Sequence, residues 1–419
     1  MYSFAHLSDV HLGFQKTDVL QKVEQEVFEK ALDECLKRKV DFILIPGDLF
    51  HVNIPEIRVQ KFAIRKFRQI HEAGIPVYVV YGSHDFSPVS NSVIDLLVEA
   101  GYLVKVSKQN ESQDDKIRLE FTTDSKTGAK IVGLPGLKAG KELEYYEKLD
   151  RKTLESEPGF KIFLFHAGLA ELKSKVTAET DFMPLSLLPK GFDYYAGGHM
   201  HTWHEAKYPE YGHIIFPGTL FYGHYGDLEE NATGQKRGLV FAEFDKKIEK
   251  VEFVSIDNVD CKLIEFDADK KGSKSVNDEL IKEIRDFDPV NKVILIKVFG
   301  ELASGKTTDI DFSVIREELK QKGALQVEIN KNQLLSKEYN ISAAPGKNKT
   351  EIETNVFKEN IGQIRSNQNV LLADSGFSLA KKLLTELAHP KLENEKTKDY
   401  QNRLTQTALQ ILELKIDDS

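Results

Sequence analysis

The segment Phe4-Ala5-His6-Leu7-Ser8-Asp9-Val10-His11 places an Asp-x-His pair directly after a short apolar run. A run of this kind predicts a β-strand. Residues i and i+2 of an extended chain point to the same side, so both side chains can reach one ion. Carboxylate and imidazole groups are suitable ligands for Mn, Fe or Zn. The segment therefore predicts a pair of metal ligands where the first strand ends.

Four more segments repeat this arrangement after apolar runs at 42–45, 77–80, 162–165 and 194–196. They are Gly47-Asp48-Leu49-Phe50-His51, Gly82-Ser83-His84-Asp85, His166, and Gly198-His199-Met200-His201. Taken singly each is a weak signal, because a histidine at a strand end is more often structural and Gly-Asp is usually a turn. Together they are a strong signal, since open α/β sheets gather their ligand sites at the carboxyl ends of strands.

The number of candidate ligands predicts a two-metal site. Six candidate ligands are too many for one ion and suit two ions that share a bridging carboxylate. They are Asp9, His11, Asp48, His166, His199 and His201. We expect Asp85 to accept structural hydrogen bonds and not to bind metal.

The rest of the chain predicts a layered α/β domain with mixed sheets and flanking helices over residues 1–257. Residues 17–39 and 58–71 have helical spacing of apolar side chains, whereas 238–244 and 251–255 are expected to be antiparallel strands. A small α+β domain is expected over 258–334, with strands at 292–299 and 325–329 and a helix over 313–322. A polar linker over 335–375 and two amphipathic helices within 376–419 complete the chain.

Composition indicates a soluble globular protein with 41% hydrophobic and 29% charged residues. No apolar run is long enough for a membrane span, and the N-terminus does not resemble a secretory signal. Only two cysteines occur, Cys35 and Cys261, which predicts a reducing, cytoplasmic setting. The net charge of -9 lowers the expectation of tight non-specific DNA binding, but a local basic surface or bound metal ions can still attract phosphate.

The five segments resemble the pattern D-x-H, G-D, G-N-H-D, H and G-H-x-H of the calcineurin-like metallophosphoesterase superfamily. His51 after Gly47-Asp48, together with the long C-terminal extension, makes the chain similar to one branch, the Mre11/SbcD nucleases of DNA double-strand-break repair, in their archaeal form. The resemblance covers nearly the whole chain. It implies a nuclease domain, a capping domain and a helical tail.

The resemblance also implies roles for the site residues. One ion, most plausibly Mn²⁺, is expected on Asp9, His11 and His201, and a second on His166 and His199, with Asp48 bridging. The catalytic residues are then His84, which acts on the scissile phosphate or the leaving oxygen, and His51, which helps to position the DNA backbone.

Position 83 departs from the family pattern. The family has an asparagine there that ligates the second metal, whereas this chain has Ser83, a shorter and poorer ligand. We expect Ser83 to belong to the ligand set of the second metal ion and this ion to bind weakly as a result. Two alternatives to a repair nuclease stay open, namely a phosphodiesterase or phosphatase for small molecules and a catalytically impaired scaffold.

The partners are likewise expected from the resemblance. They are DNA ends, an SMC-like coiled-coil ATPase of the Rad50/SbcC type bound through 376–419, and a second copy of the chain that meets it near 91–97. A nucleoid-associated location follows.

One segment of the predicted α+β domain matches the P-loop pattern, namely Gly300-Glu301-Leu302-Ala303-Ser304-Gly305-Lys306-Thr307. It is interpreted as a strand–helix loop, because Ser313 is a better helix N-cap than Lys306-Thr307, so no cofactor-binding site is expected there.

Overall fold

The computed structural model describes residues 1–86, 92–110, 116–137, 142–172, 182–285, 287–336, 373–392, 395 and 397–412. The chain divides into two compact units. The first contains residues 1–264, 288–296 and 318–328, and the second contains 265–287, 297–317 and 329–419.

The first sheet of the first unit has six strands in the order β16-β15-β1-β2-β3-β4. Its central strands β1, β2 and β3 are parallel, whereas β15 and β16 are antiparallel additions at one edge. The strands span Tyr2–His6 (β1), Phe42–Pro46 (β2), Val77–Val80 (β3), Val104–Lys105 (β4), Gly238–Phe244 (β15) and Ile248–Ser255 (β16).

The second sheet has the order β13-β14-β12-β9-β8-β7, and its strands β8, β9, β12 and β14 are parallel. The strands span Thr122–Thr123 (β7), Lys130–Leu134 (β8), Lys161–His166 (β9), Tyr194–Gly198 (β12), His204–Lys207 (β13) and His213–Phe216 (β14). Two short ladders complete the strands, formed by Gln109–Asn110 (β5) with Arg118–Leu119 (β6) and by Gly168–Leu169 (β10) with Phe182–Met183 (β11).

The two sheets pack face to face. A buried cluster between them takes Phe4, Phe42 and Tyr78 from the first sheet and Ile162 and Tyr194 from the second. The continuous apolar runs of β2, β3 and β9 are therefore covered on both faces.

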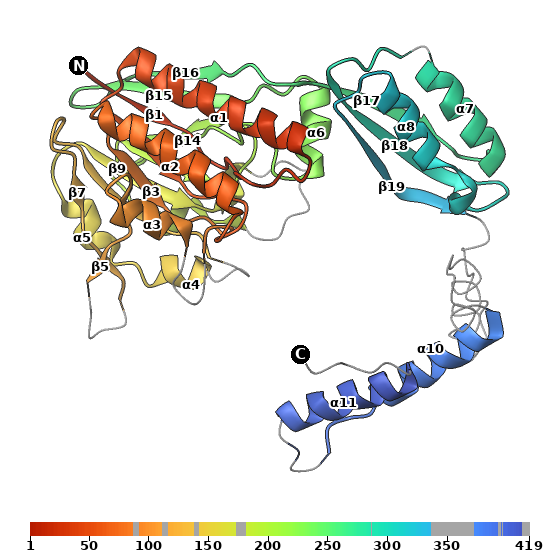
Figure 1. The fold of residues 1–419 in the computed structure, drawn as a ribbon. Helices are drawn as coiled ribbons and strands as arrows, with labels where there is room; N and C mark the ends of the chain where they lie inside the picture. Colours follow the sequence, from red (N-terminus) through yellow and green to blue (C-terminus); the bar gives the residue numbers. More distant parts are fainter. Residues whose placement is uncertain are drawn as a thin grey trace. The chain divides into compact units, whose positions relative to one another are not determined.

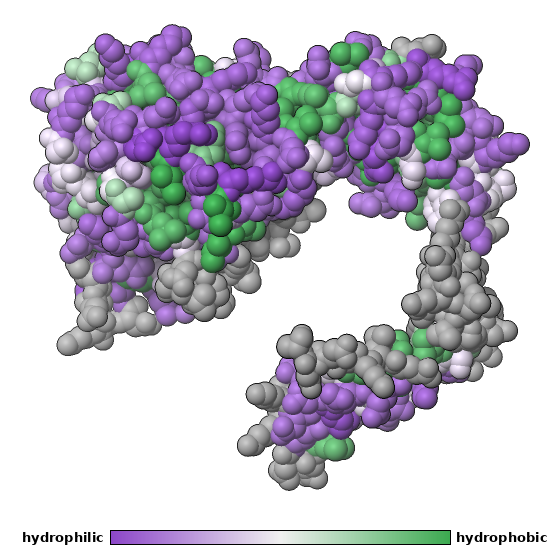
Figure 2. All heavy atoms as spheres, in the orientation of Figure 1, coloured by the Kyte–Doolittle hydropathy of each residue, from purple (hydrophilic) through white to green (hydrophobic). Residues whose placement is uncertain are grey.

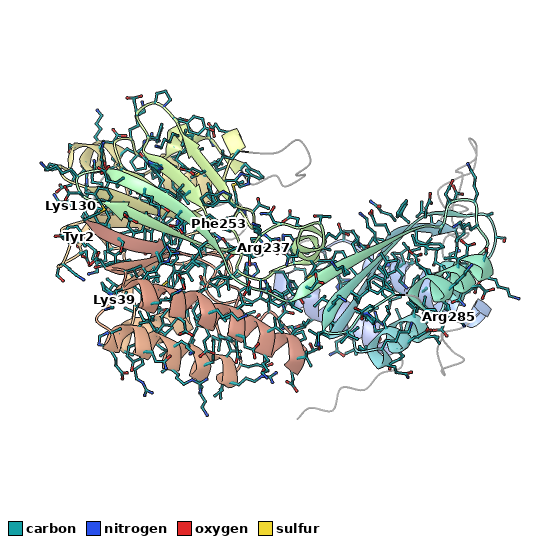
Figure 3. The ribbon with its side chains drawn as sticks, turned by 90° about the horizontal axis from the view of Figure 1, so that it is seen from above. Tyr2, Lys39, Lys130, Arg237, Phe253 and Arg285 are labelled. Atoms are coloured by element: carbon teal, nitrogen blue, oxygen red, sulfur yellow. The ribbon has the colours of Figure 1, made fainter. Side chains whose placement is uncertain are left out.

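Helices cover the outer faces, as Figures 1 and 3 show for the pair α1 and α2. The helices α1 (Asp18–Arg38), α2 (Ile57–Glu72) and α3 (Val93–Glu99) bury their apolar faces in a cluster on the first sheet. The side chain of Thr17 accepts the Leu20 N–H and begins α1, and Lys39 ends it in the left-handed conformation. The shorter helices are α4 (Glu142–Glu147), α5 (Arg151–Ser156) and α6 (Tyr225–Ala232).

A separate three-stranded sheet has the order β17-β18-β19. Its elements are β17 (Asp260–Asp267), α7 (Ser273–Arg285), β18 (Lys292–Leu302), α8 (Phe312–Gln321) and β19 (Gln326–Ser336). The P-loop-like stretch runs from the end of β18 into a single 3₁₀ turn at Thr307–Asp309, so its interpretation as a strand–helix loop is confirmed. The expected N-cap was wrong, however, because the Asp311 carboxylate, not Ser313, accepts the N–H groups of Ser313 and Val314.

The two predicted C-terminal helices are α10 (Ala373–Leu387) and α11 (Thr397–Ile411), which contact each other. Most of the predicted linker falls on 337–372, outside the described residues. Within the part of the chain that the structure describes, no helix is both long and apolar enough to cross a membrane. The predicted fold class, a layered α/β domain with mixed sheets and flanking helices, is confirmed. The domain limits 1–257, 258–334, 335–375 and 376–419 stay predictions.

Candidate metal centre

The candidate site lies where the parallel strands of both sheets end. Asp9 follows β1, Asp48 follows β2, and His166 is the last residue of β9. The two sheets are tied together at this edge, because the ring Nδ1 of His166 lies 2.9 Å from the carbonyl oxygen of Pro46. The sheet edges thus bring together residues that are far apart in the sequence.

The backbone at these positions is strained. Asp9, His11, Asp48 and His199 have positive φ angles of 49°, 51°, 50° and 84°. Residues other than glycine seldom adopt this region, and such conformations gather at functional sites, where the surrounding structure enforces them. These four residues all belong to the candidate metal centre.

One ligand cluster contains Asp9, Asp48 and His166, all buried. The Asp48 Oδ2 atom lies 3.2 Å from His166 Nε2 and 3.9 Å from His11 Nε2, so it stands between two imidazoles. Burial alone would raise the pKa of Asp48, but the neighbouring imidazoles, led by His166, hold it well below its usual range. Burial would lower the pKa of His166, and the Asp48 carboxylate outweighs it and raises that pKa to about 10.

A second cluster shares Asp9 and adds His11 and His201. The Nε2 atoms of His11 and His201 face each other at 3.1 Å. Both oxygens of the Asp9 carboxylate accept the backbone N–H of His199, at 3.0 and 3.1 Å, which fixes the carboxylate beside the Gly198-His199-Met200-His201 turn.

The donor set fits divalent metal ions. The Nε2 of His166 is buried and has no hydrogen-bond partner among the described residues, although it lies close to Asp48 Oδ2. A divalent cation between this imidazole nitrogen and the carboxylate would be bound by both groups, which are suitable ligands for Mn, Fe or Zn. The facing nitrogens of His11 and His201 favour a shared cation in the same way.

A residue that the sequence did not reveal orients His201. The Asp227 carboxylate lies 2.8 Å from His201 Nδ1, so Nδ1 donates to it and Nε2 is left as the ligand atom. The buried guanidinium of Arg237, labelled in Figure 3, donates to the carbonyl oxygens of His201 and Asp227. No motif spacing marks Asp227 or Arg237. The signal that was available is the acidic residue in the first turn of a helix just after Gly223-His224.

Two glycines make room for the ligands. A Cβ at Gly82 would lie 2.1 Å from Asp48 Oδ1, and a Cβ at Gly223 would lie 2.5 Å from His11 Cδ2 and 2.9 Å from His201 Cε1. Any side chain at these positions would displace a candidate ligand.

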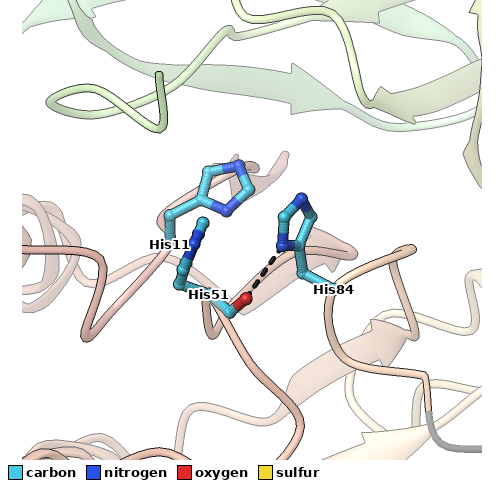
Figure 4. A group of neighbouring side chains, drawn as sticks. All are labelled: His11, His51 and His84. Atoms are coloured by element: carbon cyan, nitrogen blue, oxygen red, sulfur yellow. Dashed lines mark hydrogen bonds between the residues drawn. The ribbon is translucent and has the colours of Figure 1, made fainter. Parts of the chain in front are cut away.

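His84 and His51 stand beside this centre (Figure 4). The His84 Nδ1 donates to the carbonyl oxygen of His51 at 2.8 Å, which leaves Nε2 free of that bond, and the His84 N–H donates to Asp48. Burial, helped by the nearby His84, lowers the pKa of His51 to about 4, so this ring is neutral at pH 7.

The remaining predicted residues are also located. The ring of His199 lies 5.4 Å from that of His166, centroid to centroid. Ser83 is partly exposed in the turn after β3, next to His84. The Asp85 carboxylate accepts the N–H groups of Leu49, Phe50 and Gly82, which confirms it as a structural acceptor. The structure therefore brings the expected residues to one edge of the two sheets, while the role of each as a ligand stays a prediction.

Comparisons with known proteins agree with this geometry. Residues 2–203 match the calcineurin-like phosphoesterase family. The DNA double-strand break repair protein Mre11 of Methanopyrus kandleri is 26% identical over 60% of this chain and 56% of the relative. The protein of the same name from Sulfurisphaera tokodaii is 32% identical over 47% of this chain and 48% of the relative.

The alignment with a third relative is longer. The Mre11 protein of Saccharolobus solfataricus is 25% identical over 72% of this chain and 76% of the relative. The chain thus spans about half the length of the first two relatives and about three quarters of the third. With the ligand segments in order and the two-sheet fold present, residues 2–203 form a calcineurin-like phosphoesterase domain, and the chain is similar to archaeal proteins named Mre11.

Proposed function

We propose that this protein is a metal-dependent phosphodiesterase that cleaves DNA, as an exonuclease and endonuclease acting on double-strand ends. The observation that carries the proposal is the pair of ligand clusters that share Asp9 at the carboxyl ends of parallel strands. DNA is the proposed substrate because the archaeal relatives are named as DNA double-strand break repair proteins.

In this proposal Asp9, His11 and His201 hold one ion, and His166 and His199 hold the other. Asp48 bridges the two, in keeping with its position between the rings of His11 and His166. When bound, two Mn²⁺ ions would activate a water and neutralise charge on the scissile phosphate. Ser83 completes the second set through its hydroxyl.

The chain's own residues orient the ligands and manage a proton. Asp227 and Arg237 hold His201 in one tautomer and one position. The carbonyl oxygen of His51 fixes the Nδ1–H tautomer of His84, so Nε2 of His84 is the atom that contacts the phosphate or the leaving oxygen. His51 lies between His84 and Phe14, where its ring can position the DNA backbone.

We propose further that the protein works as a homodimer. Four apolar side chains support this proposal because they are exposed: Val52 (43%), Ile54 (63%), Ile57 (73%) and Leu96 (61%). Figure 2 shows apolar side chains gathered on the face that carries α2 and α3. An exposed apolar group of this kind supports a protein contact. Leu96 is the exposed residue that the described part of the expected dimer face, 92–97, contributes to it, and Asn91 lies outside the described residues.

The proposed second partner is an SMC-like coiled-coil ATPase of the Rad50/SbcC type. The two proteins would bind each other at the nucleoid, where the DNA lies. Leu384, Leu387 and Leu412 of the C-terminal helices are 46, 40 and 37% exposed. Amphipathic helices with an uncovered apolar face suit docking into a groove of a partner.

The departure at Ser83 supports one second candidate, a scaffold that binds the ATPase but cleaves slowly. Replacing Ser83 with Asn tests it. A gain of tenfold or more in diesterase rate supports impairment, whereas an unchanged rate means that Ser83 is accommodated. The matched control is Ser156→Asn, a serine on α5 outside the site.

The proposed function is tested by cleavage of end-labelled duplex DNA and of bis(p-nitrophenyl) phosphate with Mn²⁺ or Mg²⁺, for the wild type and His84→Ala. Cleavage of DNA that is lost in His84→Ala supports the proposal. Cleavage of the small ester alone refutes DNA as the substrate and supports a small-molecule phosphodiesterase. Cleavage of neither, with both ions bound, leaves the scaffold as the explanation.

A further inference from the structure

A small cavity in the first unit is lined by aromatic and aliphatic side chains together with polar ones. Its volume is about 220 Å³, which is smaller than a typical pocket for a drug-sized ligand. The walls include Phe14, Gln15, Leu20, Tyr222, Tyr225 and Leu228. Aromatic walls with a restricted volume suit a single flat ring.

Two residues that line the cavity carry buried polar atoms for which the described part of the chain offers no hydrogen-bond partner. Gln15 is only 4% exposed, and its Oε1 accepts the Tyr222 hydroxyl at 2.5 Å, but its Nε2 has no hydrogen-bond partner among the described residues. The same holds for the hydroxyl of Tyr225. Buried donors of this kind are nearly always satisfied in folded proteins, so two of them around one cavity indicate a polar ligand edge that completes the site.

The cavity lies beside the candidate metal centre, because two of its wall residues neighbour residues of that centre. The Phe14 ring lies 4.6 Å from the His51 ring and 5.5 Å from the Tyr222 ring, centroid to centroid. Tyr222 is followed by Gly223, the residue that packs against His11 and His201. One aromatic side chain therefore separates the cavity from the residues proposed to hold the phosphate.

We propose that this cavity takes one unstacked nucleobase of the DNA strand whose neighbouring phosphate lies at the metal centre. The inference rests on the proposed function and adds a base subsite to it. A base offers a flat face for Phe14, Tyr222 and Tyr225 and hydrogen-bonding groups at its edge for Gln15 and Tyr225. Any base has such a face, so the subsite is tolerant of sequence, and it is occupied most easily at frayed or single-stranded ends, where unstacking costs least.

The test is an abasic scan on the full chain. Oligonucleotides of one sequence with a single-stranded end carry one abasic site at successive positions, and their affinity is measured for the wild type, Tyr225→Ala and Gln326→Trp. Gln326 lines the cavity, so an indole there would fill it. Tyr145→Ala, on a partly buried tyrosine of α4 outside the cavity, is the matched control.

For the wild type we expect one abasic position to weaken binding by about 5- to 150-fold, the range measured for base stacking on aromatic side chains. Tyr225→Ala and Gln326→Trp should bind the intact oligonucleotide that much more weakly and lose the dependence on that position. Both should cleave bis(p-nitrophenyl) phosphate at the wild-type rate.

Four results would overturn the inference. A flat scan for the wild type, with normal DNA binding, removes the subsite and leaves the proposed function standing. A scan that is unchanged by both cavity variants places the subsite elsewhere. Binding of free 2-aminopurine riboside that depends on Tyr225, combined with a flat scan, assigns the cavity to a free nucleoside. An absence of any DNA binding refutes the proposed function itself, and the inference with it.

Discussion

Replacing Gly223 with Ala tests whether the two rings beside it are positioned as metal ligands. The added Cβ would lie 2.5 Å from His11 Cδ2 and 2.9 Å from His201 Cε1, whereas ordinary contacts begin at 3.4 Å. The His11 ring must therefore move by about 0.9 Å, and a misplacement of about 1 Å in a catalytic constellation costs about 100-fold in rate. The substitution changes no ligand chemistry, so its effect is geometric.

The assay is hydrolysis of bis(p-nitrophenyl) phosphate over a Mn²⁺ titration, with thermal unfolding measured in chelator. We expect the rate to fall about 100-fold, with an overpacking cost of about 1–3 kcal/mol in the free energy of unfolding. Gly226→Ala is the control, since its Cβ meets only the exposed His224 ring, at 3.1 Å. Wild-type rate and Mn²⁺ dependence for Gly223→Ala would refute the assignment of His11 and His201 as metal ligands.

Three further predictions follow from the buried groups. Asp227→Asn should weaken Mn²⁺ binding about 10- to 100-fold in calorimetric titration, because it replaces the charged acceptor of His201 Nδ1 with a neutral amide, and unchanged affinity would contradict that role. The Asp48 and Asp227 carboxylates outweigh burial and raise the pKa values of His166 and His201 to about 10 and about 9, respectively. Mn²⁺ binding should therefore release protons from these rings, and the affinity for Mn²⁺ should rise as pH rises from 6 to 9. An affinity that is constant over this range would contradict the prediction. Burial raises the pKa of Glu24 to about 7, so between about pH 4.5 and 7 the folded chain binds one proton more than the unfolded chain. The free energy of unfolding should therefore fall by up to about 3 kcal/mol as pH rises through this range. Urea denaturation in chelator should show this fall in the wild type and not in Glu24→Gln.

Much of the first unit could be predicted because its signals are local. The runs at 42–45, 77–80 and 162–165 are buried strands, and the helical spacing over 17–39 and 58–71 corresponds to α1 and α2. Each motif lies at the carboxyl end of a strand, so the strand directions together with the packing of the two sheets bring Asp9, Asp48 and His166 together. Fold and site could be predicted together for this reason.

Other elements gave weaker signals. β17 and α7 were not predicted, because the alternation of charged and apolar residues in β17 is broken at Leu263-Ile264 and α7 has a narrow apolar stripe of Val276, Leu280 and Ile284. β14 has only four residues, and its role appears only once it pairs with β12.

The supporting residues of the site could not be predicted either. Asp227 and Arg237 act on His201 through contacts across 26 and 36 residues of sequence, and no periodicity encodes such a contact. The cavity beside Phe14 depends on side chains from α1, α6 and β19 that meet only in three dimensions.

The central claim is that the clusters around Asp9 and Asp48 hold two metal ions at one phosphodiester site. The most direct measurement is the number of Mn²⁺ ions bound per chain, determined by native mass spectrometry and calorimetric titration of chelator-treated protein. The account predicts two ions for the wild type and a loss of at least one in Asp48→Ala, whose side chain lies between the rings of His11 and His166. A wild type that binds no Mn²⁺, or a single ion unaffected by Asp48→Ala, would contradict it.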